Sequence, residues 1–336
     1  MKYRAFGRHS NQVSEIGYGS WGIGGGPAWS GTEDPLSQKC LLRAFELGVN
    51  FFDTALVYGN GHSESLLGEF AQKVGRHHIL IATKIPPKNM EWPARPEVTL
   101  SDTFDKNHIR LCTEKSLKHL QSDYIDVQQL HVWQDSWLSQ DEWKEELTKL
   151  KEEGKIRFVG VSINSHNPES AIQLVQSRII DSIQLIYNIF DPRARDILFQ
   201  HCQENGIAVI ARVPLDEGGL SGKITKDTTF PEGDFRSLYF KDHRTTEVEE
   251  RVHRLRNVMR GRVHSVPELA LRFCLSHPQV TTVIPGMRKI EHVEVNVSAS
   301  AAGPLSDDLL QELKDHAWIR NFYPSRQDIQ RTLSVT

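Results

Sequence analysis

Short apolar runs recur along the 336-residue chain and alternate with longer stretches of helical character. The runs are rich in Ile, Val, Phe and Tyr, and most of them are apolar at consecutive positions. This pattern is typical of strands in a parallel sheet that is covered on both faces. Eight runs predict strands, at Ile16–Gly19, Val49–Asp53, Ile79–Lys84, Tyr124–His131, Arg157–Ser162, Ser182–Asn188, Ala208–Arg212 and Thr281–Pro285.

Helix signals lie between these runs. Glycine commonly ends a helix, while Ser, Asn or Asp before an amphipathic stretch commonly starts one. A serine followed three residues later by glutamate forms a capping box. The signals predict helix ends at Gly48 and Gly206, helix starts at Asn107, Ser306 and Asn167 (with Pro168 as the first helical residue), and a capping box of Ser265 and Glu268.

The alternation of strands and helices fits both a doubly wound sheet and an eight-stranded barrel. Because eight units follow one another without a change of pattern, we expect an α/β fold of the (β/α)8 TIM barrel type, with residues 1–336 as a single domain. A β-hairpin at residues 2–13 is expected to cover the bottom of this barrel. The stretch after the seventh strand, from Val213, begins rich in Gly, Pro and charge and is expected to be a long functional loop.

The composition excludes several classes of protein. Apolar residues make up 38% and charged residues 25%, and the net charge of −3 predicts no attraction to nucleic acid or to an anionic membrane. There is no apolar stretch long enough for a membrane helix or a signal peptide. The four cysteines are far apart, which argues against a zinc site or a redox dithiol and predicts reduced, mostly buried thiols in a cytoplasmic protein.

Chemically active side chains stand where the predicted strands end. Asp53 closes the second strand, Lys84 the third and His131 the fourth, and Tyr58 follows Asp53 by five residues. In such barrels, active groups lie at the carboxyl ends of the strands. Taken alone, each residue has a simpler explanation: a histidine among fifteen is usually structural or exposed, and a strand-end lysine is usually solvated. The four together fit one mechanism, and this favours a functional site.

The physical argument starts from the phenol, whose unperturbed pKa of about 10 makes it a reluctant acid. A nearby cation favours the phenolate, so Lys84 is expected to assist Tyr58, with Asp53 keeping Lys84 charged and oriented. A neutral His131 can donate one N–H to a substrate oxygen. This set suits protonation of a carbonyl oxygen while a hydride reaches the carbonyl carbon.

The chain resembles the aldo-keto reductase family in motifs that appear in order, from about Tyr3 to Trp318. The motifs are FFDTALVYGNGHSESLLG, ATK, DYIDVQQLH, IRFVGVSIN, SIQLIYN, VPLDEGGLSGK and TTVIPGMRKIEHVEVNV. The resemblance implies a (β/α)8 barrel that binds a nicotinamide cofactor in an extended form. It also implies that Asp53, Tyr58, Lys84 and His131 are a catalytic tetrad, with Tyr58 as the proton donor.

The resemblance further implies where the cofactor binds. Ser162 and Gln184 match residues that hold the nicotinamide carboxamide, and Asn164 is a third member, although many relatives carry that asparagine where this chain has Ile163. A tyrosine of many members is replaced by Arg212, which fits the branch with the GGLSGK loop. The implied set is completed by Gly19, Ser20 and Trp21 near the first strand, by Pro214, Leu215, Gly219, Ser221 and Lys223 after the seventh, and by Ile284, Gly286, Arg288 and Asn296 on the adenine side.

The resemblance thus implies reversible, NADPH-dependent reduction of an aldehyde or ketone to the alcohol. Arg288, helped by Lys289, favours the 2′-phosphate of NADPH, and NADH stays possible because some members have other residues where this chain has Gly286, Met287 and His292. The substrate is expected to be a small carbonyl compound held by Trp21, Tyr58, His131 and Trp133. The sequence leaves its identity and the oligomeric state open.

The sequence also allows three alternatives. The alternative within the family is a cofactor-bound regulatory protein, similar to a channel subunit, with little turnover. The segment Gly17–Gly22 matches the dinucleotide fingerprint GxGxxG, but loop residues follow it instead of a helix, so we treat the match as accidental. A metal-dependent hydrolase is not favoured, because the strand ends carry no cluster of metal ligands, and no metal is expected.

Overall fold

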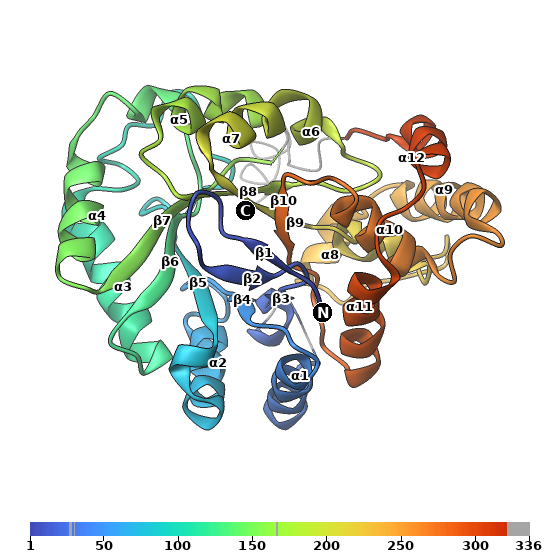
Figure 1. Ribbon diagram of the computed structural model, residues 1–336, viewed down its shortest axis with the longest axis horizontal. Coiled ribbons are helices and arrows are strands. Elements are labelled where there is room, and N and C mark those ends of the chain that lie inside the picture. Colours follow the sequence, from blue (N-terminus) through green and yellow to red (C-terminus); the bar gives the residue numbers. More distant parts are fainter. Residues whose placement is uncertain (27–28, 30, 166, 321–336) are drawn as a thin grey trace.

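Eight parallel strands lie side by side in chain order and curl around a common axis (Figure 1). The structure is a computed structural model, and it describes residues 1–26, 29, 31–165 and 167–320. Each predicted run overlaps one strand, and the bounds agree to within two residues. The strands are β3 (Tyr18–Gly19), β4 (Phe51–Asp53), β5 (Leu80–Ile85), β6 (Ile125–Leu130), β7 (Ile156–Ser162), β8 (Ser182–Ile186), β9 (Ala208–Arg212) and β10 (Val280–Val283).

The sheet closes where its first and last strands meet. Ile16 forms a parallel bridge with Val283, and Gly19 forms another with Gly286. The backbones approach closely here, because a Cβ atom at Gly19 would lie 2.6 Å from the carbonyl oxygen of Ile284. Closure makes this fold a (β/α)8 TIM barrel, as predicted.

Helices surround the barrel and bury its outer face (Figure 1). β4 and β6 are buried along their whole length, which confirms the expectation of strands covered on both faces. The helices are α1 (Asp34–Glu46), α2 (His62–Val74), α3 (Lys106–Leu120), α4 (Glu142–Glu152), α5 (Ile172–Ser177), α6 (Arg193–Ile197), α7 (Phe199–Asn205), α8 (Phe235–Tyr239), α9 (Arg244–Met259), α10 (Val266–Leu275), α11 (Ile290–Ala302) and α12 (Asp307–Leu313).

One predicted helix start differs from the structure, and another begins a 3-10 turn instead of an α-helix. α3 begins earlier than predicted, because the side chain of Asp105, and not that of Asn107, accepts the backbone N–H of His108 at 2.9 Å. Asn167 is the N-cap residue of the 3-10 turn Pro168–Ala171, which starts with Pro168 as predicted, although the Asn167 side chain makes no capping hydrogen bond. α5 follows this turn.

The other helix signals are confirmed. The hydroxyl of Ser265 accepts the N–H of Glu268 at 3.2 Å, although the Glu268 carboxylate accepts from His264 and not from the serine backbone. Gly48 and Gly206 follow α1 and α7 with φ angles of 93° and 65°. These left-handed angles are the reason why glycine is favoured at helix ends.

The long loop predicted after the seventh strand contains a helix that the sequence analysis missed. α9 is rich in charge, and its buried side chains are Val248, Val252, Leu255 and Met259. Their spacing of three and four residues is the signal that would have identified it. The irregular part after β9 therefore ends before α9 and is shorter than predicted. It contains the 3-10 turn η6 (Asp216–Ser221) and α8.

An N-terminal hairpin closes one end of the barrel, as predicted. Its strands β1 (Tyr3–Ala5) and β2 (Gln12–Ser14) pair antiparallel and lie across the barrel end that faces the viewer in Figure 1. The ring of Phe6 lies 6.3 Å from the ring of Phe51 and 5.2 Å from that of Phe158, measured between centroids. These residues belong to a small apolar cluster inside the barrel.

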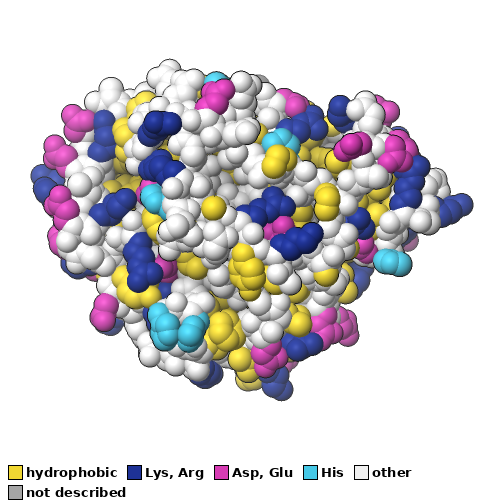
Figure 2. All heavy atoms as spheres, in the orientation of Figure 1, with side chains coloured by type: hydrophobic (Ala, Val, Ile, Leu, Met, Phe, Trp, Pro, Cys, Tyr) yellow, Lys and Arg dark blue, Asp and Glu magenta, His cyan; other side chains and the backbone are white. Residues whose placement is uncertain are grey.

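The surface on the hairpin side carries charges of both signs. Figure 2 shows that Lys and Arg are interspersed there with Asp and Glu, without a broad area of one sign. The four cysteines are buried and unpaired, as predicted. None of the helices within the described ranges is both long and apolar enough to cross a membrane.

The hairpin closure leads to a prediction about stability. Phe6→Ala is expected to lower the free energy of unfolding by about 3–5 kcal/mol, because it leaves a cavity between rings that are held in place by the barrel. Urea denaturation measures this. Leu111→Ala, at an exposed position of α3, is the control and should change stability by no more than about 0.5 kcal/mol. Equal effects of the two substitutions would contradict a packed closure.

Candidate active site

Three side chains converge at the carboxyl ends of β4 and β5. The ammonium of Lys84 donates to Asp53 Oδ1 at 2.6 Å and to the backbone oxygen of Thr54 at 2.7 Å, and its Nζ lies 3.5 Å from Tyr58 Oη. Lys84 is completely buried, and the Asp53 side chain is only 3% exposed. The structure therefore brings these three predicted residues together in direct contact.

His131 follows β6 and completes the group. Its ring meets the Tyr58 ring edge to face, at 5.9 Å between centroids, and its Nδ1 is buried without a hydrogen-bond partner. Burial, followed by the positive charges of Lys84 and Arg212, holds the pKa of His131 well below its ordinary value. The imidazole is therefore neutral near pH 7, as the sequence argument required.

The second oxygen of Asp53 is held by two amides from inside the barrel. Gln184 Nε2 donates to Asp53 Oδ2 at 2.7 Å, and Gln129 Nε2 lies 3.3 Å from the same oxygen. Gln184 also lies beside Ser162, whose Oγ is 3.5 Å from Gln184 Oε1. The sequence analysis missed Gln129. Its position in β6 could have indicated it, because Gln129 pairs with Lys84 of the neighbouring strand β5.

Burial also decides the ionisation of the phenol. It raises the pKa of Tyr58 far above the ordinary value, and the Asp53 carboxylate adds to the rise. Burial lowers the pKa of Lys84, while Asp53 opposes that shift. Burial, and not the nearby cation, therefore sets the ionisation of the phenol in the folded chain. The expected help of Lys84 to Tyr58 during the reaction stays a prediction. Tyr58 is a neutral phenol that keeps its proton.

Aromatic side chains from three loops surround Tyr58 and His131. Trp21, in the 3-10 turn η1 (Trp21–Ile23) after β3, stacks on Tyr58 at 5.8 Å with an interplanar angle of 27°. Trp92, from the loop after β5, meets His131 edge to face at 5.6 Å. Phe235 of α8 packs on Trp21 at 4.9 Å. Trp21 was predicted, whereas Trp92 and Phe235 were not.

Trp133 is not part of this aromatic wall, and its predicted role in the substrate pocket is wrong. Its side chain is completely buried, and its Nε1 donates to Asp135 Oδ1 at 2.9 Å. The ring packs against Trp137 and Trp143 at 5.9 and 5.3 Å. Trp133 thus belongs to the core that α4 covers.

Asn164 holds the loop that carries Trp92. Its amide accepts the backbone N–H of Ala94 at 3.1 Å and donates to the carbonyl oxygens of Ala94 and Trp133 at 3.3 and 2.8 Å. Gln134 adds a further bond to the Ala94 oxygen at 2.6 Å. The polar atoms of Asn164 are therefore engaged in fixing residues 86–105 to the barrel.

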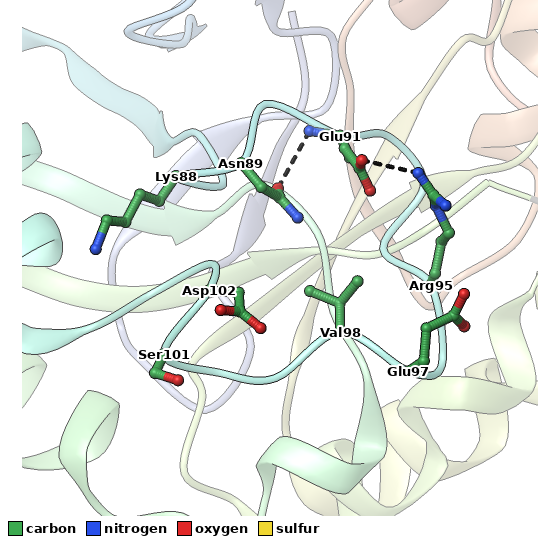
Figure 3. Close-up of a pocket in the computed structure, with 8 residues that line it drawn as sticks. All are labelled: Lys88, Asn89, Glu91, Arg95, Glu97, Val98, Ser101 and Asp102. Carbon is green, nitrogen blue, oxygen red and sulfur yellow. Dashed lines mark hydrogen bonds and ion pairs between the residues drawn. The ribbon is translucent and has the colours of Figure 1, made fainter. Parts of the chain in front are cut away.

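The same loop surrounds a surface cavity of about 480 Å³ (Figure 3). Glu91 pairs with Arg95 at 2.7 Å, Asn89 accepts the N–H of Glu91 at 3.2 Å, and Lys88 pairs with Asp105 at 2.8 Å. These contacts join residues of one loop, so the cavity is formed by the folding of this loop.

Two predicted cofactor residues present polar atoms that a ligand could satisfy. Asn296 on α11 is 3% exposed, and its Nδ2 has no partner. Arg212 at the end of β9 donates through Nη2 to Ser165 Oγ at 2.9 Å and to the Ile163 oxygen at 3.1 Å, while its Nε is buried without a partner. Open space surrounds the position where Gly286 would carry a Cβ atom.

The other predicted cofactor residues lie near the same barrel end. Arg288 runs along Gly22, where a Cβ atom would lie 2.8 Å from Arg288 Cδ. The hydroxyl of Ser20 donates inward to the Asp53 backbone oxygen at 2.6 Å. Ser221 Oγ accepts the N–H of the exposed Lys223 at 3.2 Å. Gly19, Pro214, Leu215, Gly219 and Ile284 lie at the ends of β3, β9 and β10 or in the loop after β9.

Across the described residues, no three His, Cys, Asp or Glu side chains are grouped so that they could hold a metal ion.

The model of the aldo/keto reductase family matches residues 15–317. The chain belongs to the aldo/keto reductase family. It is accordingly an NAD(P)H-dependent oxidoreductase that acts on carbonyl compounds and alcohols.

Named relatives span nearly the whole chain. The aldo-keto reductase YhdN of Bacillus subtilis (strain 168) is 31% identical over 88% of this chain and 87% of its own length. Among solved structures, the holo form of aldo-keto reductase AKR11C1 from Bacillus halodurans has a TM-score of 0.73 at 29% identity, and the match covers 98% of this chain and 99% of that one.

Two further relatives have names that state different cofactors. The NADH-specific methylglyoxal reductase of Escherichia coli (strain K12) is 30% identical over 89% of this chain and 93% of its own. The aldo-keto reductase yakc [NADP(+)] of Schizosaccharomyces pombe (strain 972 / ATCC 24843) is 27% identical over 91% and 89%. A nicotinamide cofactor therefore follows from the family, whereas the preference for one of the two does not.

One titratable group near the site of this aldo/keto reductase escaped the sequence analysis. Glu217 in η6 has a left-handed backbone, with φ of 53°. Burial raises the pKa of its carboxyl to about 7; the Asp216 carboxylate adds to the rise, and Arg212 and Arg236 oppose it. Glu217 also contributes to the raised pKa of Tyr58.

The raised pKa of Glu217 leads to a prediction about how the free energy of unfolding depends on pH. Between about pH 4.5 and 7 the unfolded chain releases a proton from Glu217 that the folded chain retains, so the free energy of unfolding falls as pH rises through this window. Glu217→Gln removes this contribution. In urea denaturation without cofactor, the variant should gain stability relative to the native protein between pH 4.5 and 8. A difference that is independent of pH would contradict a raised pKa of the Glu217 carboxyl.

Proposed function

We propose that this aldo/keto reductase reduces an aldehyde or ketone to the alcohol with NADPH, and that Tyr58 is the proton donor. The observation that supports this most directly is the contact of a buried ammonium, Lys84, with both Asp53 and Tyr58. A neutral phenol that touches a buried cation is suited to give up a proton during the reaction.

Each residue of the site has a defined role in this proposal. When bound, the nicotinamide supplies the hydride that reaches the carbonyl carbon. His131, being neutral, donates an N–H to the carbonyl oxygen and orients it, and Tyr58 protonates the same oxygen. Lys84 stabilises the phenolate that remains, and Asp53 keeps the ammonium in place. The reverse oxidation uses the same groups in the opposite order.

The cofactor is proposed to bind along the carboxyl ends of β7 to β10. Ser162 and Gln184 would hold the carboxamide. Arg212 and Asn296 carry the buried, unpartnered N–H groups described above, which support a polar ligand at these two positions. Ser221 and Lys223 would contact the pyrophosphate. Asn164 is not retained as a cofactor contact, because its amide already holds Ala94 and Trp133.

The preference for NADPH rests on positive charge at the start of α11. Arg288 and Lys289 lie side by side in the chain, and the Arg288 guanidinium lies 5.7 Å from the ring centroid of Trp29. A guanidinium on an aromatic ring is a suitable partner for a 2′-phosphate.

The first prediction of this proposal concerns the proton donor. Tyr58→Phe is expected to lower kcat by about 10²–10⁴-fold, because the proton source is lost. The Kd for NADPH should stay unchanged. Turnover is followed through the absorbance of NADPH with a panel of aldehydes and ketones. Tyr3→Phe, at the opposite barrel end, is the control.

The turnover rate of the native protein in the same assay distinguishes a reductase from the alternative, a regulatory protein. A regulatory protein similar to a channel subunit would bind NADPH and turn over every compound slowly, with or without Tyr58. Full activity in Tyr58→Phe would instead remove Tyr58 from the mechanism.

The second prediction concerns the 2′-phosphate. Arg288→Ala is expected to weaken NADPH binding by about tenfold, the loss of one charge-assisted contact, and to change NADH binding much less. Fluorescence titration gives both dissociation constants. Arg260→Ala, an exposed arginine after α9, is the control. An unchanged ratio of the NADPH and NADH constants in Arg288→Ala would refute the assignment.

A further inference from the structure

Asp216 is a buried carboxylate at the start of the turn η6, the turn that ends at Ser221. It is 2% exposed, and its φ of 51° is left-handed. The next two residues, Glu217 and Gly218, have φ angles of 53° and 106°. Left-handed backbone is unfavourable for residues other than glycine, so this conformation requires contacts that hold it.

Two side chains from distant parts of the chain hold the Asp216 carboxylate. Arg320 Nη2 donates to Oδ2 at 2.7 Å, and Tyr239 Oη donates to Oδ1 at 2.6 Å. Arg320 belongs to the segment after α12, and Tyr239 ends α8. A side chain at Gly219 would collide with Oδ2, so the turn closes tightly around this carboxylate.

Arg320 is itself fixed by aromatic packing. Its guanidinium lies 4.1 Å from the ring centroid of Trp318, whose backbone N–H donates to the Phe190 oxygen at 2.7 Å. Arg251 of α9 lies 4.4 Å from the same ring centroid, on a separate element of the fold. The C-terminal segment is thus joined to the loop after β8, to α9 and to η6.

The ion pair between Arg320 and Asp216 compensates for the burial of the Asp216 carboxylate. Burial raises the pKa of Asp216, and the Arg320 cation is the first influence that opposes it. A buried carboxylate that loses its cation is strongly destabilised, whereas removal of both charges costs far less. The cheapest response of the turn to the loss of Arg320 is to move Asp216 toward water, which would displace the residues that follow it.

We infer that Arg320 is a positioning residue for cofactor binding, because its ion pair with Asp216 holds η6 in the shape that presents Ser221 and Lys223. The inference rests on the proposed function, since it takes these two residues as pyrophosphate contacts. Arg320 touches neither the cofactor nor the substrate in this inference and acts through Asp216 alone. Because the pyrophosphate is common to both cofactors, the effect should be the same for NADPH and NADH.

The experiment measures the dissociation constants of NADPH and NADH by titrating tryptophan fluorescence, together with the melting temperature. Arg320→Met is expected to raise both constants by about tenfold, which corresponds to 1.4 kcal/mol. The value of kcat at saturating cofactor should change little, because Tyr58 and Lys84 are not touched. Asp216→Asn/Arg320→Met should bind both cofactors more tightly than Arg320→Met, since no buried charge stays unpaired.

Arg251→Met is the matched control, because it removes an arginine from the same tryptophan without touching Asp216. It should leave both dissociation constants within about twofold, an effect below the size of one ordinary contact. Arg320→Lys, which keeps the charge but loses the planar donor, should fall between the native protein and Arg320→Met. If Arg320→Met does not fold, Arg320→Lys and Tyr239→Phe supply the test, and each should raise both constants.

Two outcomes would overturn the inference. A lower melting temperature with unchanged dissociation constants would make Arg320 merely structural. Weaker binding that the additional Asp216→Asn substitution does not relieve would show that Arg320 acts by another route. Both outcomes are decided by binding constants, which are independent of the turnover assay that tests Tyr58. A failure of this inference is therefore distinguishable from a failure of the role of Tyr58.

Discussion

The site depends on one unfavourable burial, that of the Lys84 ammonium at the top of the barrel. An ammonium removed from water needs a counter-charge and acceptors for its protons. Asp53 supplies the charge, and the Thr54 carbonyl and the Tyr58 oxygen accept further contacts. Asp53 in turn needs Gln184 and Gln129 for its second oxygen. Four strands of a closed barrel are required to bring these groups together.

The barrel interior accordingly changes character along its axis. Its lower part is apolar and is closed by Phe6 and Val13 of the hairpin and its connecting turn. Its upper part contains the hydrogen-bonded network around Asp53 and Lys84. Stability and chemistry are thus assigned to opposite ends, which is the usual division of labour in barrels of this type. Burial at the upper end also explains why His131 and Tyr58 are both neutral.

The strands and the tetrad could be predicted because their signals are local. Apolar runs mark the strands, and the residue that ends each run lies at the same end of the barrel as its neighbours. Trp133 and Trp92 show where this reasoning stops: both follow strand ends, and only the packing of α4 and of the loop after β5 decides which ring faces His131. The raised pKa of Tyr58 was unpredictable for a similar reason, because it depends on how completely the folded chain excludes water.

The bond between Asn164 and Ala94 suggests how the specificity of this enzyme could diversify. The amide recognises backbone atoms of Ala94, so it places almost no demand on the identity of the surrounding side chains. Exposed positions of residues 86–105 can therefore change while the loop returns to the same anchoring point, whereas Leu100 and Phe104 are held in the core. Such an arrangement separates sequence change at the exposed part of this loop from the maintenance of the network around Asp53 and Lys84, and it makes that part a segment that related enzymes can exchange.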